Sequence, residues 1–392
     1  MSGITRDRVR YPIPDRELER RWKLLRAAMK EREIDCLILQ NDNQFLGGYV
    51  RYFTDIPAHQ YPTTVIFPAD EEMTVIEHGA RSGPPSAVDR GVRHKIGLPY
   101  IPTLNYTNSY APEAAVKVVK DLKCKRVGFV GLGFVSAAFY QYFSEHLKGI
   151  EILDATDLVD EIKAVKSPDE IAFIRKAVAI HDYAASALPA IIRPGRYEYE
   201  IRNDIEKLLK DLGSEEQLIM MGSAPPGTAT PQLLSFFHHR RVEPGDQVFV
   251  MIEVNGPGGY YAEIGRTWCL GEPSKELLDA WETALAAQKL VASMLKPGAD
   301  PAELLKANNE FLESRGYAPE KRLFGHGQGY DLVERPAFVE RETIRLKEGM
   351  FVAVHPLAAN DKAYAFCCDN YLITADGAER VQKTPQDVFV IA

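Results

Sequence analysis

The side chains best suited to chemistry stand far apart in the second half of the chain. Glu263 follows a glycine-rich turn, His326 lies in the run Gly-His-Gly, His355 precedes a proline and Cys368 precedes an aspartate. A carboxylate, two imidazoles and a thiol are groups that bind zinc or iron, and they also transfer protons. Because tens of residues separate them, only a tertiary fold can bring them together.

Length and composition limit the class of protein. The 392 residues are enough for two cores, and the 45% hydrophobic and 26% charged residues are those of a globular protein. The net charge is −8 and no basic tract is longer than Arg240-Arg241, which argues against nucleic acid as the main partner. There is no apolar run of about 18 residues for a membrane helix. Without a secretory signal or CxxC spacing, we expect a cytoplasmic protein that does not bind membranes.

The first part of the chain alternates between strand and helix patterns. An amphipathic helix is expected from Asp15, and buried-strand runs follow at residues 35–40, 63–67, 73–77, 126–130 and 151–153. A helical pattern covers residues 112–123. This order predicts a smaller α/β domain over residues 1–160.

A helix start marks the entry to a second domain, expected over residues 161–392. In Ser167-Pro-Asp-Glu170, Ser167 can cap the helix, Pro168 suits its first position and Glu170 can close a capping box. The helix should continue over residues 171–192. Further on we expect a hairpin of strands 247–254 and 260–270, helices 274–295 and 301–315, and strands 351–355 and 366–374.

Five segments of this second half, in order, resemble the pita-bread fold shared by creatinase, aminopeptidase P and prolidase. They are Lys163 to Glu170, Gly245-Asp246 with the strand after it, Gly259 to Thr267, Gly325 to Pro336, and the pair Gly349 to Pro356 and Cys368 to Thr374. The resemblance implies a creatinase-like N-terminal α/β domain followed by a C-terminal pita-bread α+β catalytic domain.

The resemblance also implies a site, and this chain departs from it. In the peptidases, two aspartates, one histidine and two glutamates hold two divalent metals. Here the histidine is kept as His326, Glu263 replaces the second aspartate, and His355 and Cys368 replace the glutamates. The first aspartate's place falls on Met251 or Ile252, with Glu253 on the same strand face as Met251. The places of two accessory histidines hold Leu234 and Val333.

Two chemistries remain open from these residues. In one, a single zinc or iron ion is held by Glu263, His326 and His355, and possibly by Cys368. In the other no cofactor is expected, and the two histidines act as acid and base groups oriented by Glu263 or Glu253. Cys368 could then be a nucleophile activated by His355. The bridging arrangement for two metals is lost in both.

These departures predict chemistry other than ordinary peptide cleavage. We expect a creatinase-like hydrolase of a non-peptide C–N bond in a small polar molecule. The alternatives are a lyase that works by base-driven elimination, as in dimethylsulfoniopropionate lyases, a metal-dependent Xaa-Pro-type peptidase, or an inert binding module. We expect a homodimer in which the loop at residues 55–62 reaches the partner's site. Substrate contacts are expected from His59, Tyr61, His238, Tyr261 and Glu334.

Overall fold

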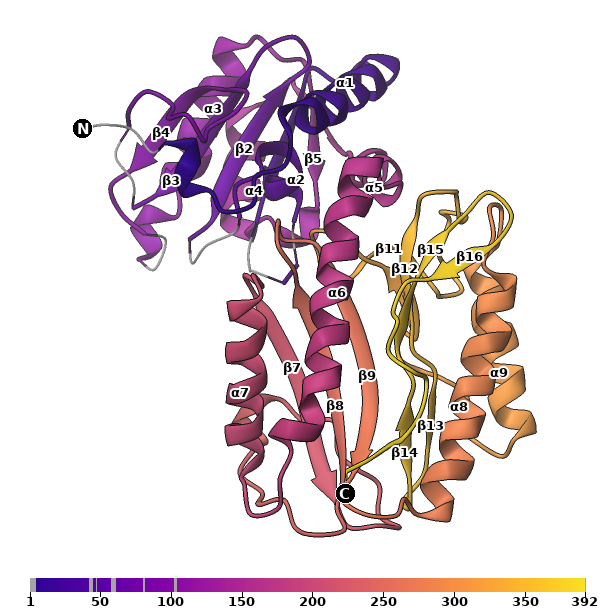
Figure 1. Cartoon of the computed structure of the whole chain (residues 1–392). Coiled ribbons are helices and arrows are strands. Elements are labelled where there is room, and N and C mark those ends of the chain that lie inside the picture. Colours follow the sequence, from indigo (N-terminus) through magenta and orange to yellow (C-terminus); the bar gives the residue numbers. More distant parts are fainter. Residues whose placement is uncertain are drawn as a thin grey trace. The chain divides into compact units, whose positions relative to one another are not determined.

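The computed structural model describes residues 5–41, 45–46, 48–57, 61–79, 82–101 and 104–391. Contacts divide the chain into two compact units, Met1–Lys163 and Ala164–Ala392 (Figure 1). In the described part of the chain, no helix combines the length and the apolar character that a membrane span requires.

The first unit is built around a six-stranded mixed sheet in the order β4-β3-β2-β1-β5-β6. Strand β1 is antiparallel to β2 and parallel to β5. Its helices pack apolar side chains such as Val116, Val119 and Phe139 against the sheet. The predicted α/β class is therefore confirmed. The strands are β1 (Cys36–Gln40), β2 (Thr63–Pro68), β3 (Met73–His78), β4 (Val92–Leu98), β5 (Arg126–Val130) and β6 (Glu151–Asp154), and the helices are α1 (Asp15–Glu31), α2 (Tyr49–Thr54), α3 (Tyr110–Asp121), α4 (Ala137–His146) and α5 (Thr156–Ala164).

The second unit opens with the predicted capped helix. In α6 (Pro168–Ile191), the Ser167 hydroxyl accepts a hydrogen bond from the Glu170 backbone N–H at 3.2 Å. The Glu170 carboxylate accepts one from the Ser167 backbone N–H at 2.8 Å. The capping box is thus complete, and Pro168 occupies the first turn, where no N–H is needed.

Helices α6 and α7 (Glu198–Asp211) cover one face of a four-stranded sheet in the order β17-β9-β8-β7 (Figure 1). Alternation along β8 and β9 separates two sets of side chains. Ile252 and Ile264 belong to the core under the helices, whereas Met251 lies in a different cluster together with Cys368. The strands are β7 (Gln217–Ala224), β8 (Gln247–Asn255), β9 (Tyr261–Cys269) and β17 (Phe389–Val390).

Helices α8 (Lys275–Met294) and α9 (Pro301–Ser314) pack against the remaining strands. These form a five-stranded sheet in the order β11-β10-β12-β15-β16 and a two-stranded sheet of β13 and β14. Their bounds are β10 (Gly325–Gly327), β11 (Glu334–Ala337), β12 (Phe351–Val354), β13 (Leu357–Ala359), β14 (Tyr364–Phe366), β15 (Asp369–Ile373) and β16 (Ala378–Arg380).

One predicted strand, residues 366–374, is wrong as a continuous element. The chain pairs with β13 up to Phe366 and with β12 from Asp369 onward. Between them, Cys368 pairs with Gly265 of β9 through two backbone hydrogen bonds of 3.4 Å. The strand is interrupted because the chain changes partner strands at this point. The pairing of Cys368 with Gly265 joins this segment to β9.

Candidate functional site

Glu263, His326 and His355 meet in the second unit. Glu263 lies on β9, His326 on β10, and His355 directly follows β12, which is antiparallel to β10. The Nε2 atoms of the two histidines are 3.2 Å apart. The Glu263 carboxylate lies 3.4 Å from His355 Nε2 and 3.9 Å from His326 Nε2. The structure thus brings together three of the residues that sequence analysis singled out.

Burial favours the neutral form of each of these groups. It lowers the pKa of His326 to about 4, and, together with the neighbouring His326 and Arg322, it lowers the pKa of His355 well below its usual range. Burial, followed by the charge of Glu253, raises the pKa of Glu263 well above its usual value. The cluster therefore carries no charge of its own that would repel a cation.

A closed set of buried amides orients Glu263. Gln328 Nε2 donates to the Glu263 carboxylate at 2.9 Å, and Gln328 Oε1 accepts from Asn370 Nδ2 at 2.7 Å. Asn370 Oδ1 accepts from the Glu263 backbone N–H at 2.9 Å and from Gln382 Nε2 at 2.8 Å. Gln382 Nε2 also donates to the Glu263 backbone carbonyl at 2.9 Å. These bonds fix both the strand and the side chain of Glu263.

Cys368 contacts Glu263 rather than the histidines in the described structure. Its thiol donates to Glu263 Oε1 at 3.1 Å. Burial, followed by the Glu263 charge, raises the pKa of this thiol well above its usual value. A thiol that resists ionisation is a poor nucleophile, and its Sγ lies against Glu263 rather than within the donor group, so the structure supports neither role expected for Cys368. Its neighbour Cys367 faces the other way, into the apolar cluster of α8.

Strand alternation decides which residue occupies the ambiguous place of the first aspartate. Met251 faces the site and packs with Cys368, whereas Ile252 faces the helices. Glu253 is paired with Glu263 across the β8–β9 ladder and is partly exposed. Burial raises the pKa of Glu253 to about 7, against the opposing effect of Arg322. The site therefore has a second carboxylate that can exchange a proton near neutral pH.

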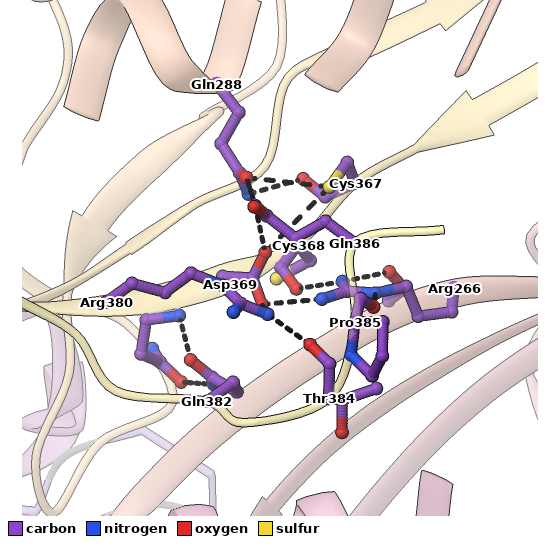
Figure 2. Close-up of polar contacts among 12 residues, drawn as sticks. Arg266, Gln288, Cys367, Cys368, Asp369, Arg380, Gln382, Thr384, Pro385 and Gln386 are labelled. Atoms are coloured by element: carbon purple, nitrogen blue, oxygen red, sulfur yellow. Dashed lines mark hydrogen bonds and ion pairs between the residues drawn. The ribbon is translucent and has the colours of Figure 1, made fainter. Parts of the chain in front are cut away.

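A buried ion pair behind the site joins β9 to β15. Arg266 Nη2 donates to Asp369 Oδ1 at 2.7 Å, and both side chains are fully buried. Figure 2 shows Asp369 between Arg266, Arg380 and Gln386, with Gln386 donating to its second oxygen at 3.0 Å. Arg266 Nη1 also donates to the Cys368 carbonyl at 2.7 Å. Through its ion pair with Arg266, Asp369 thus holds β15 in position against β9.

Four of the expected substrate-binding residues have other contacts in the structure, and His59 lies outside the described residues. His238 is buried and its Nε2 donates to the Leu233 carbonyl at 2.7 Å. Glu334 forms a buried ion pair of 2.6 Å with Lys166. Tyr261 is 1% exposed and Tyr61 is 37% exposed. Within the second unit, His238 thus binds a backbone carbonyl and Glu334 binds a lysine. Their expected substrate contacts stay predictions.

The donor cluster fits one divalent cation. A tetrahedral ion with bonds of about 2.0–2.1 Å separates its donor atoms by about 3.3 Å, which is close to the distances found here. His326 Nδ1 donates to the Gly327 carbonyl at 2.9 Å, which leaves Nε2 unprotonated as a ligand must be. In the described residues, the ligand atoms that lie within 4.8 Å of one another belong to Glu263, His326 and His355. Cys368 is not among them, and Met251 offers no hard ligand for a second ion.

Sequence analysis missed the residues that support this cluster. Gln328 and Asn370 lie inside the segments that carried the family resemblance. Gln328 is two residues after His326, and Asn370 directly follows Asp369. Polar amides one or two residues from a predicted ligand, in otherwise buried strands, were the available signal. Gln382 had no such signal, because it follows β16 and reaches the site only through the fold.

Comparisons with known proteins agree with this architecture. The family described as metallopeptidase family M24 matches residues 172–375, and the creatinase/prolidase N-terminal domain matches residues 21–165. An Xaa-Pro dipeptidase of Pyrococcus furiosus is 29% identical over 308 residues, covering 74% of this chain and 85% of the relative.

Two solved structures share the fold at low identity. Dipeptidase PepE from Mycobacterium ulcerans has a TM-score of 0.77 at 22% identity, over 97% of this chain and 99% of its own. An X-Pro aminopeptidase from Thermotoga maritima has a TM-score of 0.79 at 21% identity, over 94% of this chain and 99% of its own. The predicted pita-bread architecture is confirmed.

The expected function was wrong. A hydrolase of a non-peptide C–N bond is contradicted by relatives named as dipeptidases over most of the chain. The replacement of individual metal ligands did not by itself identify the substrate class. These relatives support a hydrolase that acts on peptides.

Proposed function

The chain belongs to metallopeptidase family M24, and from that premise we propose that it hydrolyses the peptide bond of a dipeptide-like substrate at a single-cation site. The observation that carries the proposal is the cluster of two neutral imidazoles and one carboxylate with donor separations of 3.2–3.9 Å. The Xaa-Pro dipeptidase and PepE relatives support a dipeptide as the substrate class.

Glu263, His326 and His355 would hold the cation. Bound there, a divalent cation supplies Lewis-acid polarisation of a carbonyl and a water of lowered pKa. Gln328 and the Cys368 thiol both donate to the Glu263 carboxylate. These bonds lower its pKa against the larger effect of burial, and they orient the side chain.

Glu253 is the residue best placed to move a proton. It is paired with Glu263 on the adjacent strand, it is partly open to solvent, and its pKa of about 7 lets it take a proton at neutral pH and return it to a leaving amine. The apolar side chains of Phe249 and Met251 on the same strand limit access of bulk water.

The test combines metal content with turnover. We expect the purified protein to hold close to one equivalent of a transition metal, and to cleave members of a dipeptide panel that includes Xaa-Pro substrates. His326→Ala and Glu263→Gln should each lower kcat by about 100-fold or more and release the metal. His239→Gln is the control, because this exposed histidine lies outside the cluster. Full turnover in metal-depleted protein, or unchanged rates in both variants, would contradict the proposal.

The homodimer and the cytoplasmic location also stay proposals. If the loop at residues 55–62 completes the partner's site, a subunit with His59→Ala and Tyr61→Ala and a subunit with His326→Ala should regain activity when they form mixed dimers. Mixed dimers of two inactive parents that stay inactive would rule out a shared site.

A further inference from the structure

A cavity of about 370 Å³ opens at one edge of the sheet in the first unit. Strands β1, β3 and β5 all run toward this edge, because β2 is antiparallel to both of its neighbours and β1 is parallel to β5. The cavity is lined where these strands end, by Gln40 and Asn41 at the end of β1, His78 at the end of β3 and Gly133 after β5. The carboxyl ends of the strands are where open α/β sheets bind their ligands.

Three buried polar side chains in this cavity each have an unused polar atom. Gln40, Asn41 and His78 are 4%, 2% and 6% exposed. Gln40 Nε2 donates to a threonine hydroxyl of β2 at 2.7 Å, and Asn41 Oδ1 accepts from a backbone N–H of β2 at 3.1 Å. His78 Nδ1 donates to the Tyr100 carbonyl at 2.9 Å. Gln40 Oε1, Asn41 Nδ2 and His78 Nε2 therefore have no partner among the described residues. Since buried polar groups are almost always paired, unused atoms that line a cavity indicate a polar ligand.

The first turn of α4 adds backbone donors to the same cavity. Ser136 Oγ accepts from the Phe139 N–H at 3.2 Å, whereas the N–H groups of Ala137 and Ala138 have no acceptor in the described part of the chain. Ser136 and Ala138 both line the cavity, so the positive end of this ten-residue helix faces it. Among the described residues that line the cavity, none is acidic. Free N–H groups at a helix start, without an opposing charge, favour an anion.

We propose that this cavity binds the oxyanion of a small organic molecule, a phosphate or a carboxylate. The anion accepts hydrogen bonds from the first turn of α4 and from Asn41 Nδ2. The volume of about 370 Å³ is within the range of small-molecule sites and leaves room for an organic group beside the anion. Pro62, Phe134 and Val135, which are half-buried, give that group an apolar surface. All the described lining residues belong to the first unit, so this binding is separate from the proposed peptidase reaction.

Three ligands that share one ring test the proposal in calorimetry. Phenyl phosphate and benzoate carry the two kinds of anion, and phenol carries no charge at neutral pH. We expect at least one anion to bind, and phenol to bind at least about tenfold more weakly. The comparison of the two anions shows which oxyanion the cavity prefers.

Two substitutions place a carboxylate where the anion would lie. Ala138→Asp suits the first turn of α4, and Asn41→Asp keeps the oxygen that accepts from β2 while it replaces the unused donor. Each should weaken binding of the anion by at least about tenfold. Ala302→Asp is the matched control, because it makes the same change at the second position of α9 in the second unit. Its affinity should equal that of the unmodified protein.

The proposed cation site is the competing place for these anions, so His326→Ala is measured as well and should keep the affinity. The proposal is overturned if neither anion binds, if phenol binds as tightly, or if both Ala138→Asp and Asn41→Asp keep full affinity. An equal loss in Ala302→Asp, or loss of binding in His326→Ala, would also overturn it. Because none of the ligands contains a peptide bond, failure of the peptidase test leaves this result unchanged, and the reverse also holds.

Discussion

The Arg266–Asp369 pair allows a test of how burial changes the contribution of an ion pair to the free energy of unfolding. In Asp369→Asn, the side-chain volume is kept but the negative charge is lost. Burial opposes a charged Arg266, and it is Asp369 that keeps the Arg266 pKa above its usual value. The variant leaves a fully buried guanidinium without its counter-charge and places an amide donor against donors of Arg266 or Gln386.

Breaking a buried pair by removing one partner costs about 3–5 kcal/mol. For a domain of 150–250 residues, that corresponds to a fall in Tm on the order of 10 °C. Urea unfolding followed by tryptophan fluorescence is a suitable assay, because Trp268 and Trp281 both lie in the second unit.

The control is an arginine–carboxylate pair at the surface. Arg175 binds Glu379 through two hydrogen bonds of 2.9 Å and 2.7 Å, but the two side chains are 47% and 45% exposed. Glu379→Gln should cost less than about 1 kcal/mol. Equal losses in the two variants would refute the reasoning, since burial is the difference on which it depends.

Three further predictions concern single side chains. Burial lowers the pKa of His181 to about 4, so the folded state resists a protonation that the unfolded chain accepts below about pH 6.5. The free energy of unfolding should therefore be full above pH 6.5 and fall as the pH drops to 4, and His181→Leu should remove about 3 kcal/mol of that acid destabilisation, as measured by urea titrations across this range. Ser167→Ala removes the complete capping box of α6 and should lower stability by about 1 kcal/mol in the same assay, whereas no change would mean that packing alone starts the helix. Gln328→Ala should weaken the proposed cation affinity by about 10–100-fold in a chelator competition, and an unchanged affinity would show that Gln328 does not orient Glu263.

Much of the fold could be read from local sequence. The capping box at Ser167 and Glu170 depends on residues three apart, so the structure of α6 follows from a short segment. The α/β class of the first unit followed from alternating strand and helix patterns, and Glu263, His326 and His355 followed from five motifs in order. Function was predicted less well, because substituted ligands do not by themselves reveal the substrate class.

Other features exist only in three dimensions. The strand predicted at residues 366–374 is divided because Cys368 pairs with Gly265, a contact between residues about a hundred positions apart that no local pattern encodes. Gln382 reaches Glu263, and Arg322 reaches Phe366, through the same long-range packing. The sequence by itself determined which elements form and which groups could do chemistry. The tertiary structure decided which of those groups meet, because distances between side chains on different strands depend on how the sheets pack and not on spacing along the chain.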